Sequence, residues 1–282
     1  MLLGYNTNGF AHHDLLEAIE IVAEIGYQSV AITLDHQSLN PYSEELPSQL
    51  LRVADCLRQH KMRSVIETGA RYLLDPRTKH EPTLLTADGK DREKRIGFLK
   101  RAIDIAAALE SDCVSLWSGI LRDNISNDQA MERLVNGLEP VLQHALNLGV
   151  AVGFEPEPGM FIDTMESFER LCSRIDCDAF QMTLDVGHLH CLGETPIEEY
   201  VRRWRGQIVN VHIEDMRAGV HDHLMFGEGE MDFHPVLKAF HEIGYSGGLH
   251  VELSRHSHDA PLTARRAFEF LSSIVSSLDV SG

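Results

Sequence analysis

The chain has 282 residues, of which 43% are hydrophobic and 24% are charged, a balance typical of a folded globular protein. It carries 43 acidic and 25 basic side chains, a formal net charge of −18, together with 16 histidines. Because nucleic-acid binding depends on neutralising phosphates with basic side chains, this charge disfavours a nucleic-acid partner, and an anionic membrane surface for the same reason.

The sequence contains no sign of a targeting or membrane segment. There is no apolar run of about 18 residues, the length that a transmembrane helix needs, and Met1–Asn6 lacks the basic and apolar regions of a signal peptide. The five cysteines are odd in number and form no CxxC pair, which indicates free thiols rather than disulfides or structural zinc. We therefore expect a cytoplasmic protein.

Short apolar runs alternate with longer amphipathic segments along the whole chain. The predicted strands cover residues 2–6, 29–34, 64–67, 113–117, 150–154, 180–184, 207–213 and 248–253. The predicted helices cover residues 14–25, 44–60, 93–109, 128–148, 165–173, 196–204, 233–243 and 261–278. The strands are nearly continuous apolar runs, as expected where both faces of a parallel sheet are covered. Eight alternating units of this kind predict an α/β protein with a single (β/α)8 barrel spanning residues 1–282.

A doubly wound sheet is the alternative architecture. It usually carries a glycine-rich phosphate-binding turn after its first strand, and Asn6-Thr7-Asn8-Gly9-Phe10 does not have that pattern. No linker or low-complexity stretch divides the chain. The barrel is therefore the expected fold.

Polar residues stand where the predicted strands end. The third, fifth, sixth, seventh and eighth strands end at Glu67, Glu155, Asp185, His212 and Glu252. In a barrel of this type these ends meet at one rim, where active sites lie. Converging carboxylates repel one another strongly and need a compensating cation.

Three carboxylates and one imidazole form a ligand set that suits Mn²⁺, Mg²⁺, Co²⁺ or Zn²⁺. The sequence therefore predicts one divalent ion held by Glu155, Asp185, His212 and Glu252. Each residue alone has a simpler interpretation: Asp185 as a helix N-cap, His212 as a loop histidine, and the glutamates as solvated loop residues. Four such residues on four successive strands favour the metal site.

Several motifs resemble those of the xylose-isomerase-like superfamily of TIM barrels, which contains sugar isomerases and ketose 3-epimerases. They are Phe154-Glu155-Pro156-Glu157-Pro158-Gly159, Leu184-Asp185-Val186-Gly187-His188, Val211-His212-Ile213-Glu214-Asp215, Phe226-Gly227-Glu228-Gly229 and His250-Val251-Glu252-Leu253. The resemblance implies the same four metal ligands. It also implies that Glu155 and Glu252 are the catalytic acid/base pair, and that His188 and Arg217 contact the substrate.

A metal-dependent sugar isomerase or epimerase is the function that the resemblance implies. A divalent metal acidifies the C–H between a ketose carbonyl and its neighbouring hydroxyl and stabilises the enediolate that forms. Two carboxylates on opposite faces of a small carbohydrate or polyol then move the proton. A keto-inositol or keto-sugar dehydratase, which uses the same first step and then loses a β-hydroxyl, is the second alternative. A non-catalytic sugar-binding barrel would not need a carboxylate on each face.

The superfamily also contains endonuclease-IV-type nucleases, which use three zinc ions. The pattern is met in part, because His188, His221 and His223 stand where further zinc ligands or their neighbours would be, and these three are the candidates for a second ion. The third and fourth strands, however, end in Glu67 and in Leu116-Trp117, where the nucleases have histidines. With the −18 charge, this makes a metal-dependent phosphodiesterase the third alternative.

The predicted loop after the third strand is more than 20 residues long, a length typical of lids and binding loops. Arg71, Lys79 and His80 bring positive charge and hydrogen-bond donors to an otherwise acidic rim. They are expected to meet a phosphate, a carboxylate or sugar hydroxyls, unless the loop is simply solvated. Glu67 and Trp117 are further candidate substrate contacts. Because exposed barrel helices often pair, a homo-oligomer is the expected assembly.

Overall fold

The computed structural model describes residues 1–279. The parallel strands are β1 (Leu2–Asn6), β2 (Ser29–Thr33), β3 (Arg63–Glu67), β4 (Cys113–Leu116), β5 (Ala151–Phe154), β6 (Phe180–Asp185), β7 (Ile208–Ile213) and β10 (Gly248–Val251). The helices are α1 (Leu15–Ile25), α2 (Leu46–His60), α3 (Gly89–Leu109), α4 (Asn127–Leu148), α5 (Met165–Cys172), α6 (Val186–Cys191), α7 (Ile197–Arg203), α8 (Phe233–Glu242) and α9 (Ala260–Asp279), with 3-10 helices η1 (Thr7–Phe10) and η2 (Ser254–Asp259).

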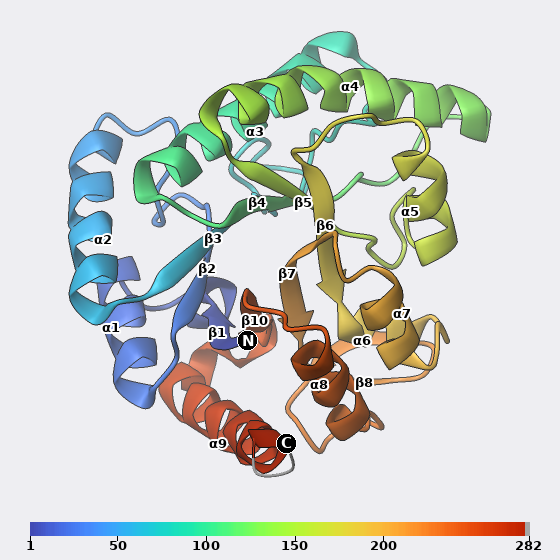
Figure 1. The fold of residues 1–282 in the computed structure, drawn as a ribbon. Helices are drawn as coiled ribbons and strands as arrows, with labels where there is room; N and C mark the ends of the chain where they lie inside the picture. Colours follow the sequence, from blue (N-terminus) through green and yellow to red (C-terminus); the bar gives the residue numbers. More distant parts are fainter. Residues whose placement is uncertain (280–282) are drawn as a thin grey trace.

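The eight parallel strands close into a barrel in the order β1-β10-β7-β6-β5-β4-β3-β2. Closure is made by β1, which pairs with β10 on one side and β2 on the other, so that Gly4 lies opposite both His250 and Ser29. Figure 1 looks along the barrel, with the strands at the centre and the helices around them. The prediction of a single (β/α)8 barrel is confirmed, and the doubly wound alternative is wrong.

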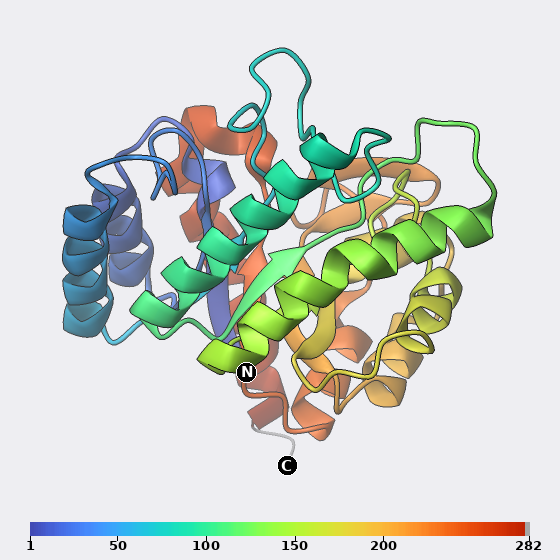
Figure 2. The same ribbon diagram turned by 90° about the horizontal axis from the view of Figure 1, so that it is seen from above.

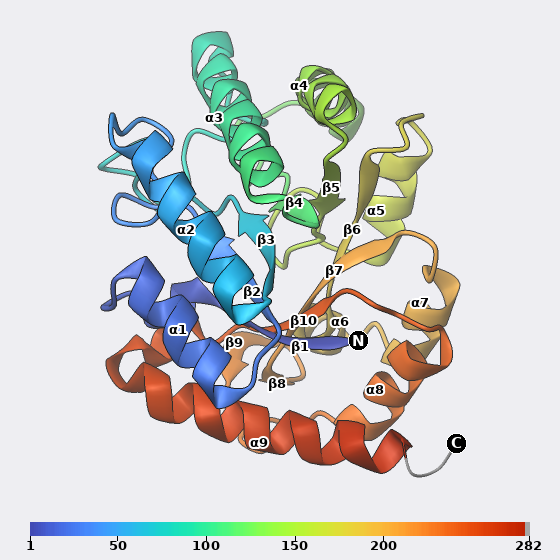
Figure 3. The ribbon, with the colours of Figure 1, turned by 60° about the vertical axis from the view of Figure 1, so that its left-hand side comes forward.

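Apolar burial on both faces of the strands explains why these segments form the inner layer. In β2, β3 and β4 nearly every residue is buried, as expected of strands covered by helices outside and side chains inside. The helices bury one stripe each: α1 buries Leu15, Ile19 and Val22 against the barrel, and Figure 3 shows α1, α2 and α9 packed around it. Within residues 1–279 we find no helix with the length and apolar character needed to cross a bilayer.

The structure adds elements that periodicity did not predict. The segment after β7 forms an antiparallel hairpin of β8 (Asp215–Arg217) and β9 (Val220–Leu224). Its strands are short, and β9 is half-exposed and carries three polar residues in succession. The sequence therefore shows no apolar periodicity that would predict this hairpin. Helix α6 follows β6 at once, with Asp185 as its N-cap. In Figure 2 the loop between β3 and α3 rises at the end opposite the N-terminus.

A histidine inside the barrel explains two of its glycines. His250 on β10 is fully buried, and a Cβ at either Gly4 or Gly248 would overlap its imidazole ring. Burial lowers the pKa of His250 to about 3, so the ring is neutral at ordinary pH. Glycine at these positions makes room for a polar side chain where barrels usually hold branched apolar residues.

Gly4→Ala should therefore destabilise the protein by about 1–3 kcal/mol, because the new methyl group displaces His250 from a packed interior. The matched control is Gly97→Ala in α3, where an added Cβ meets no atom within 4 Å and a helix gains up to about 1 kcal/mol from alanine. Urea unfolding followed by circular dichroism measures both. Equal stability of Gly4→Ala and the wild type would contradict the close packing around His250.

Candidate functional site

Four polar side chains from successive strands meet at the C-terminal rim of the barrel. Nδ1 of His212 lies 3.0 Å from Oε1 of Glu155, 3.1 Å from Oε2 of Glu252 and 3.9 Å from Oδ2 of Asp185. One ligand atom from each of the four residues lies within 4.8 Å of the others. The barrel thus brings together the four residues that the sequence predicts as metal ligands.

One carboxylate oxygen of the cluster has no hydrogen-bond partner, which indicates that the cluster fits a cation. Oδ1 of Asp185 caps α6 by accepting a hydrogen bond from the His188 N–H at 2.9 Å. Its other oxygen, Oδ2, is buried and has no hydrogen-bond partner. A buried carboxylate oxygen without a partner is costly unless a cation is nearby. Carboxylate and imidazole ligands of this kind fit a divalent transition metal or Mg²⁺.

Glu67 lies behind His212, at the end of β3. Its Oε1 is 2.9 Å from Nε2 of His212, so His212 donates its Nε2 proton away from the cluster and turns Nδ1 toward the carboxylates. Metal-binding histidines are commonly oriented in this way by a carboxylate on the second ring nitrogen. Glu67 was expected to contact substrate; it also lines the cavity, and that role stays a prediction.

Glu67 is the end of a buried chain of hydrogen bonds. Ser29 donates to Nε2 of His250 at 2.8 Å, and Nδ1 of His250 donates to Oδ1 of Asn210 at 2.7 Å. The Asn210 amide donates to Oε1 of Glu67 at 3.1 Å. These directions are mutually consistent for a neutral His250, so residues from β2, β10, β7 and β3 fix the rotamer of Glu67 and, through it, that of His212.

Burial and charge drive the pKa values in the cluster apart. Burial raises the pKa of the Glu155 carboxyl to about 8. Burial acts in the same direction on Glu252, but His212 and His223 outweigh it, so the pKa of that carboxyl lies below its usual range. Burial disfavours a charged His212, yet Glu67 and Glu155 outweigh it and hold its pKa well above the usual value. The site therefore retains a proton, or an equivalent cation, among its carboxylates.

A cavity of about 270 Å³ opens above these residues. It is lined by Glu67, Glu155, His212 and Glu252 and, from the surrounding loops, by Arg71, Lys79, His80, Trp117, His221 and His223. Arg217 is exposed on the β8–β9 hairpin and donates to the carbonyl of Glu228 at 2.9 Å, and it does not line this cavity. The structure thus brings five of the seven predicted substrate contacts to this cavity. Arg217 does not line it, and His188 lies beside it, with Nδ1 3.6 Å from Oε1 of Glu155.

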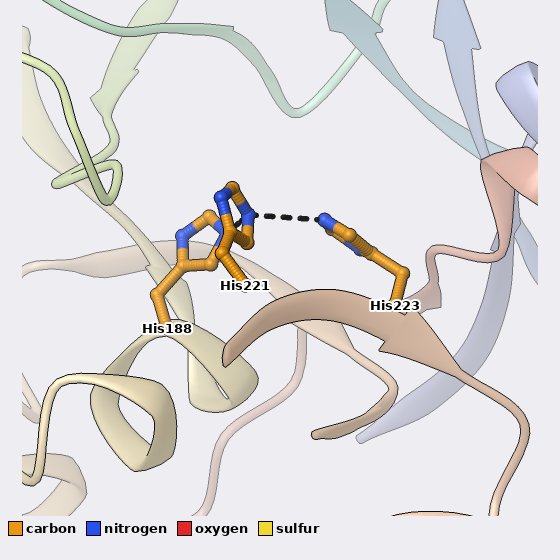
Figure 4. Close-up of side chains that lie close together, drawn as sticks. All are labelled: His188, His221 and His223. Atoms are coloured by element: carbon orange, nitrogen blue, oxygen red, sulfur yellow. Dashed lines mark hydrogen bonds between the residues drawn. The ribbon is translucent and has the colours of Figure 1, made fainter. Parts of the chain in front are cut away.

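Three histidines form a second cluster beside the first. Nε2 of His221 lies 3.1 Å from Nε2 of His188 and 3.2 Å from Nε2 of His223. Figure 4 shows the rings turned toward one another, His188 from α6 and the other two from β9. Residues 221 and 223 share one face of β9 because side chains alternate along a strand. The carboxylate of Glu157 lies 3.9 Å from both His188 and His221.

The hairpin that carries two of these histidines is anchored by Asp215. Its carboxylate accepts hydrogen bonds from the backbone N–H groups of Gly227, Gly229 and Met231 at 2.8–3.1 Å. A side chain at Gly229 would collide with Asp215. The Phe226-Gly227-Glu228-Gly229 motif thus has a structural role, since its backbone N–H groups surround the Asp215 carboxylate.

Several residues at the site were not predicted from the sequence. Asn8 follows β1 and donates from Nδ2 to Oε1 of Glu252 at 2.7 Å. Glu157 is two residues beyond Glu155 and lines the cavity, and Arg255 lies just after Glu252. Each stands close to a strand end, which is the signal that could have found them. Asn210 and His250 had no such signal, because they lie within apolar strands.

The chain matches the family model described as xylose isomerase-like TIM barrel over residues 19–274. It is 21% identical over 250 residues to L-ribulose-5-phosphate 3-epimerase of Escherichia coli, covering 87% of this chain and 84% of that enzyme. It is 30% identical over 142 residues to inosose dehydratase of Lacticaseibacillus casei, covering 44% of this chain and 47% of that enzyme, so the match spans about half of that relative.

Solved structures show the same fold. A D-tagatose 3-epimerase-like protein superposes with a TM-score of 0.82 at 20% identity, covering 100% of this chain and 99% of the other. The IolI protein with a bound zinc atom superposes with a TM-score of 0.78 at 20% identity, covering 99% of both chains. By the family match and the closed barrel, the chain belongs to the xylose isomerase-like TIM barrels.

Proposed function

We propose that the protein is a divalent-metal-dependent isomerase or epimerase that moves a proton next to the carbonyl of a small carbohydrate or polyol. The observation that carries this proposal is the pair of carboxylates, Glu155 and Glu252, that approach Nδ1 of His212 at 3.0 and 3.1 Å in one cavity. The similarity to a sugar-phosphate 3-epimerase supports the reaction class.

The metal would be held by Glu155, Asp185, His212 and Glu252. Mn²⁺, Mg²⁺, Co²⁺ and Zn²⁺ all suit this ligand set. When bound, a divalent ion supplies Lewis-acid polarisation of a carbonyl oxygen, which makes the neighbouring C–H more acidic. The protein's own contribution is to fix the ligands, through Glu67 behind His212 and through Asn8 beside Glu252.

Glu155 and Glu252 differ in the proton that each holds. The pKa of the Glu252 carboxyl lies below its usual range, so this carboxylate is the better candidate to remove the substrate proton. Burial raises the pKa of Glu155 to about 8 without the ion, and a bound cation would lower it again. Glu155 is the proposed partner that returns the proton. Proton return on the opposite face gives epimerisation, and return at the adjacent carbon gives isomerisation.

A keto-inositol or keto-sugar dehydratase is the second candidate. It begins with the same proton removal and continues with loss of a β-hydroxyl. The 30% identity with inosose dehydratase over 142 residues favours it. His188, Lys79, His80 and Trp117 are proposed substrate contacts in either case, since they lie around the cavity or at its edge.

His188, His221 and His223 are proposed to hold a second ion. Nδ1 of His188 donates to the carbonyl of Pro156, and Nδ1 of His223 donates to that of Glu252. In their neutral forms both rings then present a bare Nε2 to His221, whose single Nε2 proton can serve only one of them. A cation between the rings would satisfy all three nitrogens, and Glu157 is close enough to join them.

The reaction is tested by incubating the metal-loaded protein with a panel of keto-sugars in D₂O. NMR should show deuterium at the carbon next to the carbonyl, with an epimer, isomer or dehydrated product that separates the candidate reactions. Glu252→Gln should slow the exchange by about 100-fold or more because the base is lost, and exposed Glu132→Gln serves as the control. Absence of exchange with every keto-sugar, together with cleavage of abasic DNA, would favour the phosphodiesterase alternative instead.

The role of Glu67 is tested by metal affinity. Glu67→Ala should weaken Mn²⁺ or Zn²⁺ binding about 10–100-fold, because His212 loses the acceptor that orients it. Glu67→Gln should recover much of the affinity, since its amide oxygen still accepts the Nε2 proton. Isothermal titration calorimetry measures the three proteins. Unchanged affinity in Glu67→Ala would remove this function from Glu67.

The two ion sites are separated by counting metal. Elemental analysis of the zinc-saturated protein should find a second equivalent that His221→Ala loses while the first is kept, whereas Asp185→Ala should lose the first. A single equivalent in the wild type, unchanged in His221→Ala, would rule out the three-histidine site.

A further inference from the structure

The loop between β3 and α3 (residues 68–88) contributes two cationic side chains to the wall of the cavity. Arg71, Lys79 and His80 from this loop line the cavity that also contains Glu155 and Glu252. Within residues 1–279 no carboxylate lies within 4 Å of the Arg71 guanidinium or the Lys79 ammonium group. Arg255, the third fixed cation of the lining, is different because it is paired with Asp222.

A backbone hydrogen bond brings the two parts of the loop that carry Arg71 and Lys79 together. The His80 N–H donates to the carbonyl of Arg71 at 2.6 Å, which places Lys79 next to Arg71 on the adjacent backbone segment. Nδ1 of His80 donates to the carbonyl of Gly69, also at 2.6 Å. Ala70, Arg71 and His80 have φ values of 55°, 24° and 68°, a region that non-glycine residues seldom occupy. Such strain persists where the surrounding structure fixes the backbone, and it is concentrated at binding sites.

A buried guanidinium supports the loop from below. Arg95 on α3 is 1% exposed and donates from Nη2 to the carbonyl of Thr68 at 2.9 Å, while its Nη1 has no hydrogen-bond partner. Its Cζ lies 4.9 Å from the ring centroid of Trp117, which lines the cavity. This side of the site therefore combines two cations that face the cavity with a third behind its wall.

The position of Arg71 leaves room for a substituent. Arg71, Asn8 and Thr33 line both the main cavity and a second cavity of about 230 Å³ between the β1 and β2 loops. A substrate held at the carboxylate cluster can thus extend past Arg71. A neutral sugar would not need cations without carboxylate partners beside it. An anionic sugar would need them to offset its repulsion by the carboxylates of the same cavity.

We propose that Arg71 and Lys79 bind an anionic substituent, a phosphate monoester or a carboxylate, at the end of the keto-sugar that is remote from the carboxylate cluster. This inference rests on the proposed function for the identity of the rest of the substrate. Arginine offers a bidentate fork to either anion, and lysine adds a mobile point charge.

Binding of inorganic phosphate and of acetate to the metal-loaded protein is the direct test. Lys79→Gln and Arg71→Gln should each weaken binding of one of these anions about tenfold or more. Arg77→Gln is the matched control, since it removes the same charge from the same loop at a residue that does not line the cavity. It should change binding less than about twofold, as expected for an exposed charge at a distance.

Exchange in D₂O provides the second readout, with a ketopentose, its 5-phosphate and a keto-sugar acid compared. The preferred anion should gain at least about tenfold in kcat/KM over the neutral sugar, and Lys79→Gln should abolish this gain, whereas Arg77→Gln should keep it. Equal losses in Lys79→Gln and Arg77→Gln, or no binding of either anion, would overturn the inference. If neutral sugars exchange but neither anion binds, only the anion site is refuted. If anions bind in a Lys79-dependent way but no keto-sugar exchanges, only the proposed function is refuted.

Discussion

The convergence of carboxylates on one imidazole is the constraint on which the rest of the site depends. Glu155, Asp185 and Glu252 reach His212 from three other strands, and all four side chains are largely removed from water. Carboxylates that lie this close together away from water repel one another strongly. The cluster therefore needs a compensating positive charge. The raised pKa of His212 and the Oδ2 of Asp185 that lacks a hydrogen-bond partner both reflect this need.

Residues inside the barrel hold the His212 ring in place beside the carboxylates. The hydrogen-bond chain from Ser29 through His250 and Asn210 to Glu67 supports the His212 ring from within the barrel. Gly4 and Gly248 leave the space that His250 requires. The geometry of the cluster at the rim thus depends on strand residues inside the barrel.

The alternation of strands and helices made the fold predictable, because periodicity and strand-end residues are local signals. The four clustered residues were identified in the same way, since polar side chains at the ends of apolar strands stand out, and their role as metal ligands stays a prediction. The β8–β9 hairpin was missed because its strands are only three and five residues long and β9 carries three polar residues in succession. Asn210 and His250 were missed because an isolated polar residue within an apolar run shows its partners only once the strands are paired. Arg217 was expected near the substrate on resemblance alone, and the hairpin turns it to the surface.

The proposed function requires that the carboxylate cluster holds a divalent cation. Crystals of the protein grown with Mn²⁺ would test it most directly, through an anomalous difference map collected near the manganese edge. We expect a strong peak between Glu155, Asp185, His212 and Glu252, with Nδ1 of His212 toward the ion and Nε2 toward Glu67. An empty cluster in crystals soaked at millimolar Mn²⁺, or a peak only elsewhere on the molecule, would contradict it.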